Sequence, residues 1–142
     1  MRRGFSVPEL AIALTLMGLV TLFGLPRVRG LLDRIAVEQA AGEVTMTISL
    51  ARHLAIAWST RARLTIGEDS LMVDTLGAEG WARWRSLPGP AAQGVRLTVS
   101  NPVVVFSSNG LAWGLSNTRV ILRRGSHTET ITMSRVGRVK RW

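Results

Sequence analysis

The sequence predicts an α+β protein in which one long N-terminal helix is packed on a small antiparallel β-sheet or sandwich domain. Two observations predict this class. Apolar side chains recur at a helical spacing of about 3.6 residues as far as Trp58, and beyond it they alternate with polar ones, as in strands. The 142 residues are also enough for one domain and its core, but not for two.

The helix begins with a long apolar run. From Phe5 to Leu25 there are 21 residues in which Glu9 is the only ionisable group. A helix of that length covers about 30 Å, the thickness of a hydrocarbon core. A buried core helix and a cleaved secretory signal are the alternatives. No small-x-small cleavage motif follows the run, because Gly24-Leu25-Pro26-Arg27 stands there, so the sequence favours a membrane span.

The second half of the helix is amphipathic. Its apolar side chains draw one stripe, and charged residues can occupy the other faces. We therefore expect one helix of about fifty residues. A bend or a locally melted segment is expected near Pro26, because proline removes a helical hydrogen bond at a cost of about 3 kcal/mol. The residues of the stripe are Val28, Leu32, Val44, Ile48, Ala51, Ala55 and Trp58.

Glu9 is the residue that a membrane span explains least well. A carboxylate inside a span costs about 2.5–3.5 kcal/mol and is normally kept for a reason. One interpretation places Glu9 at the interface, with its carboxylate reaching water. The other requires a cationic partner, which the apolar run itself does not contain.

The residues around Glu9 carry a resemblance to a known family. The stretch Gly4-Phe5-Ser6-Val7-Pro8-Glu9-Leu10 resembles the class III signal of type IV prepilins and type II secretion pseudopilins, although Pro8 departs from the commonest aliphatic residue. The resemblance implies that a prepilin peptidase cuts after Gly4 and methylates the new amino terminus at Phe5. It also implies that Glu9 pairs with the terminal ammonium of a neighbouring subunit. The expected organisation is a leader at 1–4, a transmembrane helix at 5–27, an amphipathic stalk at 28–60 and the β domain at 61–142.

Short alternating segments fill the rest of the chain. Turn residues such as Gly67, Asn101-Pro102, Asn109-Gly110 and Gly125-Ser126 separate them. They predict a small antiparallel domain. The strand candidates are Ala62–Ile66, Leu71–Leu76, Trp81–Leu87, Val95–Val99, Val103–Phe106, Thr118–Leu122 and Thr128–Val136.

Three further places resemble the GspH/FimT pseudopilins. They are the helix-to-strand junction from Leu50 to Leu64, the turn Phe106-Ser107-Ser108-Asn109-Gly110 and the closing Ser134-Arg135-Val136-Gly137-Arg138-Val139. The resemblance implies a minor pseudopilin in the pseudopilus of a type II protein secretion system. It further implies a single-pass protein of the cytoplasmic membrane whose β domain lies on the far side. Its partners would be other pilins, met through N-terminal helices, and the prepilin peptidase.

The C-terminal end is strongly basic. Between Arg119 and Trp142 there are seven cations and one acid, Glu129. Some FimT-type minor pilins of naturally competent bacteria bind DNA through a basic G-R-x-R motif, which Gly137 to Arg141 resembles with lysine in place of the second arginine. The alternative function is therefore DNA uptake, and a solvated last strand is the plain structural interpretation. The candidate DNA contacts are Arg135, Arg138, Lys140 and Arg141.

The inventory of reactive side chains is poor. There is no cysteine, and the two histidines, His53 and His127, stand at no metal-ligand spacing. No glycine-rich phosphate loop is present. The sequence predicts a protein that acts by binding and not as an enzyme, with no metal and no cofactor. The family resemblance leaves the pseudopilus and DNA uptake open as functions.

Overall fold

The computed structural model describes residues 6–114 and 117–142. The chain divides into two compact units, residues 1–32 and 33–142. Helix α1, Val7–Ala57, contributes to both, and its 51 residues confirm the single long helix. The helix is continuous through Pro26. A locally melted segment, one of the two alternatives expected at this proline, is therefore absent from the described residues.

In the first unit α1 is apolar and exposed. None of its most apolar stretch is buried. Large side chains such as Leu16, Val20 and Phe23 are more than half exposed. The helix is therefore long and apolar enough to cross a membrane.

In the second unit α1 packs on the β domain. The buried stripe begins at Ala36 and not at Val28 or Leu32, which are exposed. Many of its members are alanines, whose small side chains allow the strands to approach closely. The buried helical residues are Ala36, Val37, Ala40, Ala41, Val44, Thr47, Ile48, Ala51, Leu54 and Ala55.

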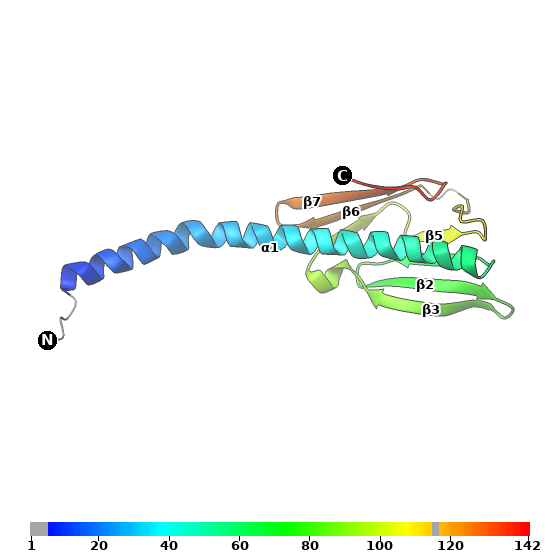
Figure 1. The fold of residues 1–142 in the computed structure, drawn as a ribbon, viewed down its shortest axis with the longest axis horizontal. Helices are drawn as coiled ribbons and strands as arrows, with labels where there is room; N and C mark the ends of the chain where they lie inside the picture. Colours follow the sequence, from blue (N-terminus) through cyan, green and yellow to red (C-terminus); the bar gives the residue numbers. More distant parts are fainter. Residues whose placement is uncertain (1–5, 115–116) are drawn as a thin grey trace. The chain divides into compact units, whose positions relative to one another are not determined.

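Within the described residues, eight strands form two antiparallel sheets of four. In Figure 1, β6 and β7 are drawn on one side of the second half of α1 and β2 and β3 on the other. The first sheet has the order β3-β2-β1-β5 and the second the order β4-β6-β7-β8. The first sheet contains β1 (Ala62–Ile66), β2 (Ser70–Gly77), β3 (Gly80–Pro88) and β5 (Val103–Phe106). The second contains β4 (Arg96–Val99), β6 (Thr118–Arg124), β7 (His127–Met133) and β8 (Val139–Arg141), and a short 3-10 helix, η1 (Pro90–Gln93), precedes β4.

The last predicted strand was too long. β7 ends at Met133, and the chain turns at Ser134–Gly137 before β8 pairs back onto β7. Gly137 closes this turn with φ of +73°, where its N–H donates to the Ser134 carbonyl at 2.8 Å. A glycine that can adopt this left-handed conformation converts one predicted strand into a hairpin.

The core lies between the helix and the inner faces of the sheets. β1 alternates as the sequence predicted, with Ala62, Leu64 and Ile66 buried. Phe106 on β5 is the largest fully buried side chain. Trp58 does not belong to the buried stripe that the sequence predicted. Helix α1 ends at Ala57, and Trp58 is 53% exposed and forms a T-shaped ring pair with Trp84.

Asp74 on β2 is a buried carboxylate held by two arginines. Its side chain is 5% exposed and accepts hydrogen bonds from Arg83 Nε at 2.5 Å and Arg63 Nη2 at 2.8 Å. Burial by itself raises the pKa of the Asp74 carboxyl. The hydrogen bonds and charges of Arg83 and Arg63 together outweigh burial and hold that pKa below its usual value.

This pairing predicts an acid-sensitive contribution to stability. Because the pKa of Asp74 is lower in the folded chain, the ion pairs stabilise it above the unfolded pKa of about 3.9 and lose that effect as the pH falls through the folded pKa. We expect Asp74→Asn to lower the thermal midpoint by a constant amount above about pH 5, and the difference from wild type to shrink below about pH 4. Thermal unfolding of both proteins at half-unit steps from about pH 2.5 to about pH 7 measures this difference in midpoint. Asp69→Asn, at the exposed turn before β2, should change the midpoint little, and a constant Asp74→Asn difference down to the lowest pH would contradict the account.

Candidate functional site

The expected processing site lies outside the described residues. Gly4 and Phe5 both belong to the segment before Ser6, so cleavage after Gly4 and methylation of Phe5 stay predictions. The first described contact is local: the Ser6 N–H donates to Glu9 Oε2 at 3.4 Å. A serine followed three residues later by glutamate is typical of a helix start, and it agrees with α1 beginning at Val7.

Glu9 is exposed in the first turn of α1. Within residues 6–32 the first cation along the helix is Arg27, 18 positions further on, which corresponds to about 27 Å of helix. No described cation of this unit can therefore reach the Glu9 carboxylate. Any cationic partner of Glu9 would therefore lie outside the described part of this unit.

The four basic C-terminal candidates do not share one face. Arg135 is exposed in the turn between β7 and β8, and Arg138 is exposed just before β8. Lys140 and Arg141 are adjacent on β8 and point to opposite sides of the sheet. The structure brings Arg138 and Lys140 together around one hollow, whose lining does not include Arg135 or Arg141.

Arg141 is engaged in an ion pair. Its Nε lies 2.5 Å from Glu129 Oε1, and the Glu129 side chain is only 15% exposed. The hydrogen bond that Arg141 donates to Glu129, and the negative charges of Glu129 and Glu38, raise the pKa of the Arg141 guanidinium. Its positive charge is thus matched by a carboxylate, which makes Arg141 the weakest of the four candidates for a phosphate contact.

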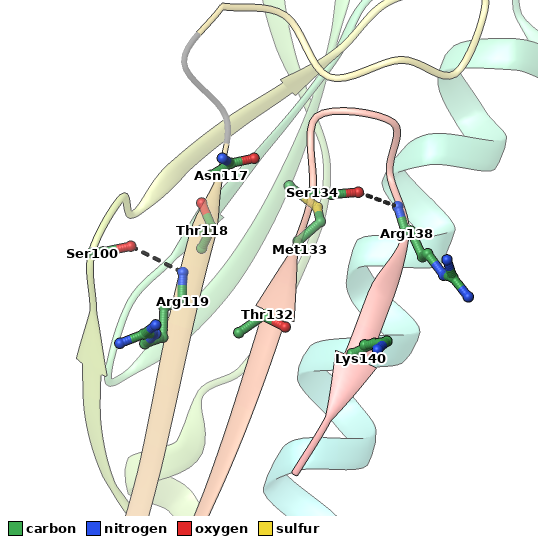
Figure 2. A pocket seen from close by; sticks show the side chains of 9 residues that line it. All are labelled: Ser100, Asn117, Thr118, Arg119, Thr132, Met133, Ser134, Arg138 and Lys140. Atoms are coloured by element: carbon green, nitrogen blue, oxygen red, sulfur yellow. Dashed lines mark hydrogen bonds between the residues drawn. The ribbon is translucent and has the colours of Figure 1, made fainter.

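Arg119 completes the hollow around Arg138 and Lys140. The hollow has a volume of about 500 Å³ and lies on β6, β7 and β8. Arg119 is opposite Thr132, and Thr132 is opposite Lys140, so the three side chains follow one row across the strands. Figure 2 shows the Arg119 N–H donating to Ser100 Oγ and the Arg138 N–H to Ser134 Oγ, at 2.9 and 3.3 Å. The rest of the lining consists of Ser100, Asn117, Thr118, Thr132, Met133 and Ser134.

The C-terminal basic motif does not predict Arg119, Arg123 or Arg96 as DNA contacts. The motif lies in the last residues of the chain, whereas these three arginines lie on β6 and β4. Arg123 Nε donates to Thr128 Oγ1 at 3.2 Å, and Arg123 is opposite Arg96. The spacing of Arg119, Ile121 and Arg123 is a strand period that places them on one face, but the pairing of β6 with β4 is not visible in the sequence.

A second group combines tryptophans with arginines around the first sheet. The Arg61 guanidinium lies 3.9 Å from the Trp113 ring centre, and that of Arg63 lies 4.6 Å from the Trp81 ring centre. Trp84, by contrast, packs partly buried against the core. Exposed tryptophan and arginine side chains are typical of protein contact surfaces.

The described residues contain no group of three or more His, Asp or Glu side chains able to hold a metal ion. His53 is exposed on α1, where its Nδ1 lies 2.7 Å from the Ser49 carbonyl. His127 is at the start of β7, opposite Arg124.

The fold is pilin-like. The structure of the type IV minor pilin FimU of Pseudomonas aeruginosa is similar with a TM-score of 0.64 and 17% sequence identity, over 76% of this chain and 89% of that one. The minor pseudopilin EpsH from the type 2 secretion system of Vibrio cholerae is similar with a TM-score of 0.62 and 15% identity, over 75% of this chain and 95% of that one. No family model matches the sequence. No curated protein matches it either.

The similarity covers 76% and 75% of this chain, whose long helix packs on antiparallel sheets as the sequence predicted. One is a subunit of a pilus and the other of a secretion system. At this level of identity the likeness defines the fold, and it does not separate a pilin from a pseudopilin.

Proposed function

We propose that this chain is a minor pseudopilin of the GspH type, which assembles into the pseudopilus of a type II secretion system. One observation carries the proposal: the first part of α1, residues 7–32, is exposed and apolar with a single carboxylate, Glu9, and the helix leads into a β domain of pilin-like fold. The protein acts by binding other subunits and not by catalysis. It is anchored in the cytoplasmic membrane by residues 5–27, with the β domain on the extracytoplasmic side.

Assembly follows from the helix chemistry. The apolar surface of α1 stays in the membrane until neighbouring helices cover it, and the Glu9 carboxylate then needs a cation in a medium of low polarity. The ammonium group of a mature chain that begins at Phe5 supplies one. This pairing fixes the axial register between neighbouring helices, because a buried charge is stable only when it is matched.

Processing of the amino terminus tests the proposal. We expect the intact mass of the chain, purified from the membranes of its host, to correspond to a start at Phe5 carrying one methyl group. Gly4→Val should block cleavage, because a bulky side chain at the cut position excludes the peptide bond from the peptidase. Ser6→Ala, two residues further on, is the control and should be processed normally. A chain that keeps Met1 to Gly4 in assembled filaments would contradict the proposal.

A second candidate function is capture of DNA by a FimT-like minor pilin. The exposed positions of Arg135, Arg138 and Lys140 favour it, whereas the ion pair between Arg141 and Glu129 does not. The genes beside the coding gene discriminate between the candidates. A secretion operon supports the pseudopilin, and a cluster of pilus or competence genes supports DNA capture.

A further inference from the structure

The outer face of the second sheet carries cations on every strand except β7. Val120, Leu122, Ile131 and Met133 are buried toward the core, so the alternate residues of β6 and β7 point outward. Register then places the outward side chains of β4 and β8 beside them. We call this surface the basic sheet face. Its cations are Arg96, Arg119, Arg123, Arg138 and Lys140, and its threonines are Thr98, Thr128, Thr130 and Thr132.

The basic sheet face has no neutralising carboxylate among the described residues. From Arg96 to the end of the chain Glu129 is the only acid, and it points inward to Arg141. Arg124 also points inward, where its Nε lies 2.9 Å from Asp33 Oδ1. The inward arginines of these strands are therefore paired, whereas no ion pair to a carboxylate holds the five outward cations in the described chain.

Two arginines are directly opposed on this face. Arg96 and Arg123 are cross-strand partners, and like charges in that position destabilise a sheet. A second shallow hollow is lined by Arg96 and Arg123, together with Arg124 and two glycines. The repulsion between Arg96 and Arg123 lowers the stability of the folded sheet. An anionic ligand placed between the two guanidinium groups would reduce that repulsion.

The spacing of the cations suits a chain of phosphates. Arg119 and Arg123 are four residues apart on β6, which is about 13 Å, and β8 lies two strands from β6, which is about 10 Å. The hollow around Arg119, Arg138 and Lys140 and the Arg96–Arg123 pair thus lie at two ends of one face (Figure 2 shows the first). Arginine, lysine and hydroxyl groups are the side chains that bind phosphate oxygens of nucleic acids.

We propose that the basic sheet face binds the phosphate backbone of duplex DNA through Arg96, Arg119, Arg123, Arg138 and Lys140, without reading base sequence. The inference deepens the second candidate function and rests on it. It keeps Arg138 and Lys140 of the C-terminal motif and extends the contact to Arg96, Arg119 and Arg123 on β4 and β6. Membrane lipid is a less suitable anion, because lipid-binding surfaces place large apolar side chains among their cations. Between the cations of this face stand threonines and the partly buried Ile121, and one exposed indole, that of Trp142, lies with its ring centre 5.1 Å from Lys140 Nζ.

The test is DNA binding by the full chain in non-ionic detergent micelles. Fluorescence anisotropy of a labelled 24-base-pair duplex, a length of about two helical turns, is followed from about 50 to 200 mM salt. If all five cations contact phosphates, the logarithm of the affinity should fall with log salt at a slope of about −4.5. Arg119→Gln/Arg138→Gln/Lys140→Gln should lower the affinity at least about tenfold and bring the slope to about −2. Arg96→Gln/Arg123→Gln should weaken binding less and remove about two units of slope.

A matched control removes the same number of charges elsewhere. Arg34→Gln/Arg61→Gln/Arg85→Gln changes three exposed arginines outside the basic sheet face and should bind as wild type does. Equal losses in the control and the test variant would overturn the proposal, because they show an effect of net charge alone. Thermal midpoints of all variants exclude unfolding as the cause of a loss.

Two further outcomes separate this proposal from the function on which it rests. If Arg135→Gln/Arg141→Gln abolishes binding while the variants of the basic sheet face bind normally, the chain captures DNA through Arg135 and Arg141 and the proposed surface is wrong. If the chain binds anionic phospholipid vesicles but no duplex, both DNA capture and this surface for DNA are wrong. Neither outcome bears on assembly through Glu9, which is measured separately.

Discussion

Glu9→Ala is expected to remove the chain from assembled filaments while leaving it in the membrane. The amount recovered in filaments sheared from the cell surface, or from cells in which the pseudopilus is overproduced, should fall at least about tenfold, equivalent to about 1.4 kcal/mol. Loss of one partner from a buried ion pair costs about 3–5 kcal/mol, because the other charge stays unmatched. The membrane level should not fall, since the substitution removes an unfavourable charge from the span.

Thr15→Ala is the control for Glu9→Ala. Thr15 is also a polar residue in the exposed half of α1, but its hydroxyl already donates to the Ala11 carbonyl at 2.8 Å within the same helix. Its removal should leave incorporation unchanged. Immunoblots of the filament and membrane fractions compare the variants. Glu9→Ala at the wild-type level in filaments would show that the carboxylate does not act in assembly.

Phe106→Ala is expected to cause the largest loss of stability in the β domain. The Phe106 side chain is fully buried on β5, where it is opposite Ala62 and bridges to Ala112. Deleting a buried phenylalanine costs about 3–5 kcal/mol through lost burial and the cavity that remains. For a unit of this size the thermal midpoint should fall by about 10–20 °C. Denaturant unfolding in non-ionic detergent, followed by tryptophan fluorescence, measures the change.

Val103→Ala is the matched control on the same strand. Val103 points outward on β5 and is 42% exposed, so its truncation should cost less than about 1 kcal/mol. Phe106→Leu keeps most of the volume and is the variant to measure if Phe106→Ala does not fold. Equal stabilities of the Phe106 and Val103 variants would show that Phe106 does not hold the core together.

Much of the fold could be predicted because its determinants are local. Leu64 and Ile66 alternate with polar neighbours, and β1 forms where that alternation predicts it. The turn of the hairpin after Met133 could not be predicted in the same way, because only the backbone conformation of Gly137 shows that the chain reverses. Ala36 and Ala40 also escaped notice, since alanine is common on both buried and exposed helix faces and acquires meaning only when a sheet packs on it.

The candidate sites also differ in whether their determinants are local in the sequence. Glu9 could be identified from the sequence because a single carboxylate in a long apolar run is a local anomaly. The separation of Arg141 from Lys140 depends on the inward position of Glu129, and the row of Arg119 and Lys140 depends on the register of three strands. Strand order and register are set by long-range packing, so a motif at one end of the chain cannot reveal them.

The central claim is that this chain is a filament subunit, and quantitative mass spectrometry of sheared, washed filaments tests it most directly. The account predicts peptides of this chain in the filament fraction, at a small fraction of the main subunit, with an N-terminal peptide that begins at methylated Phe5. Filaments that contain the main subunit but none of this chain, while the chain stays in the membrane with Met1 to Gly4 attached, would contradict it.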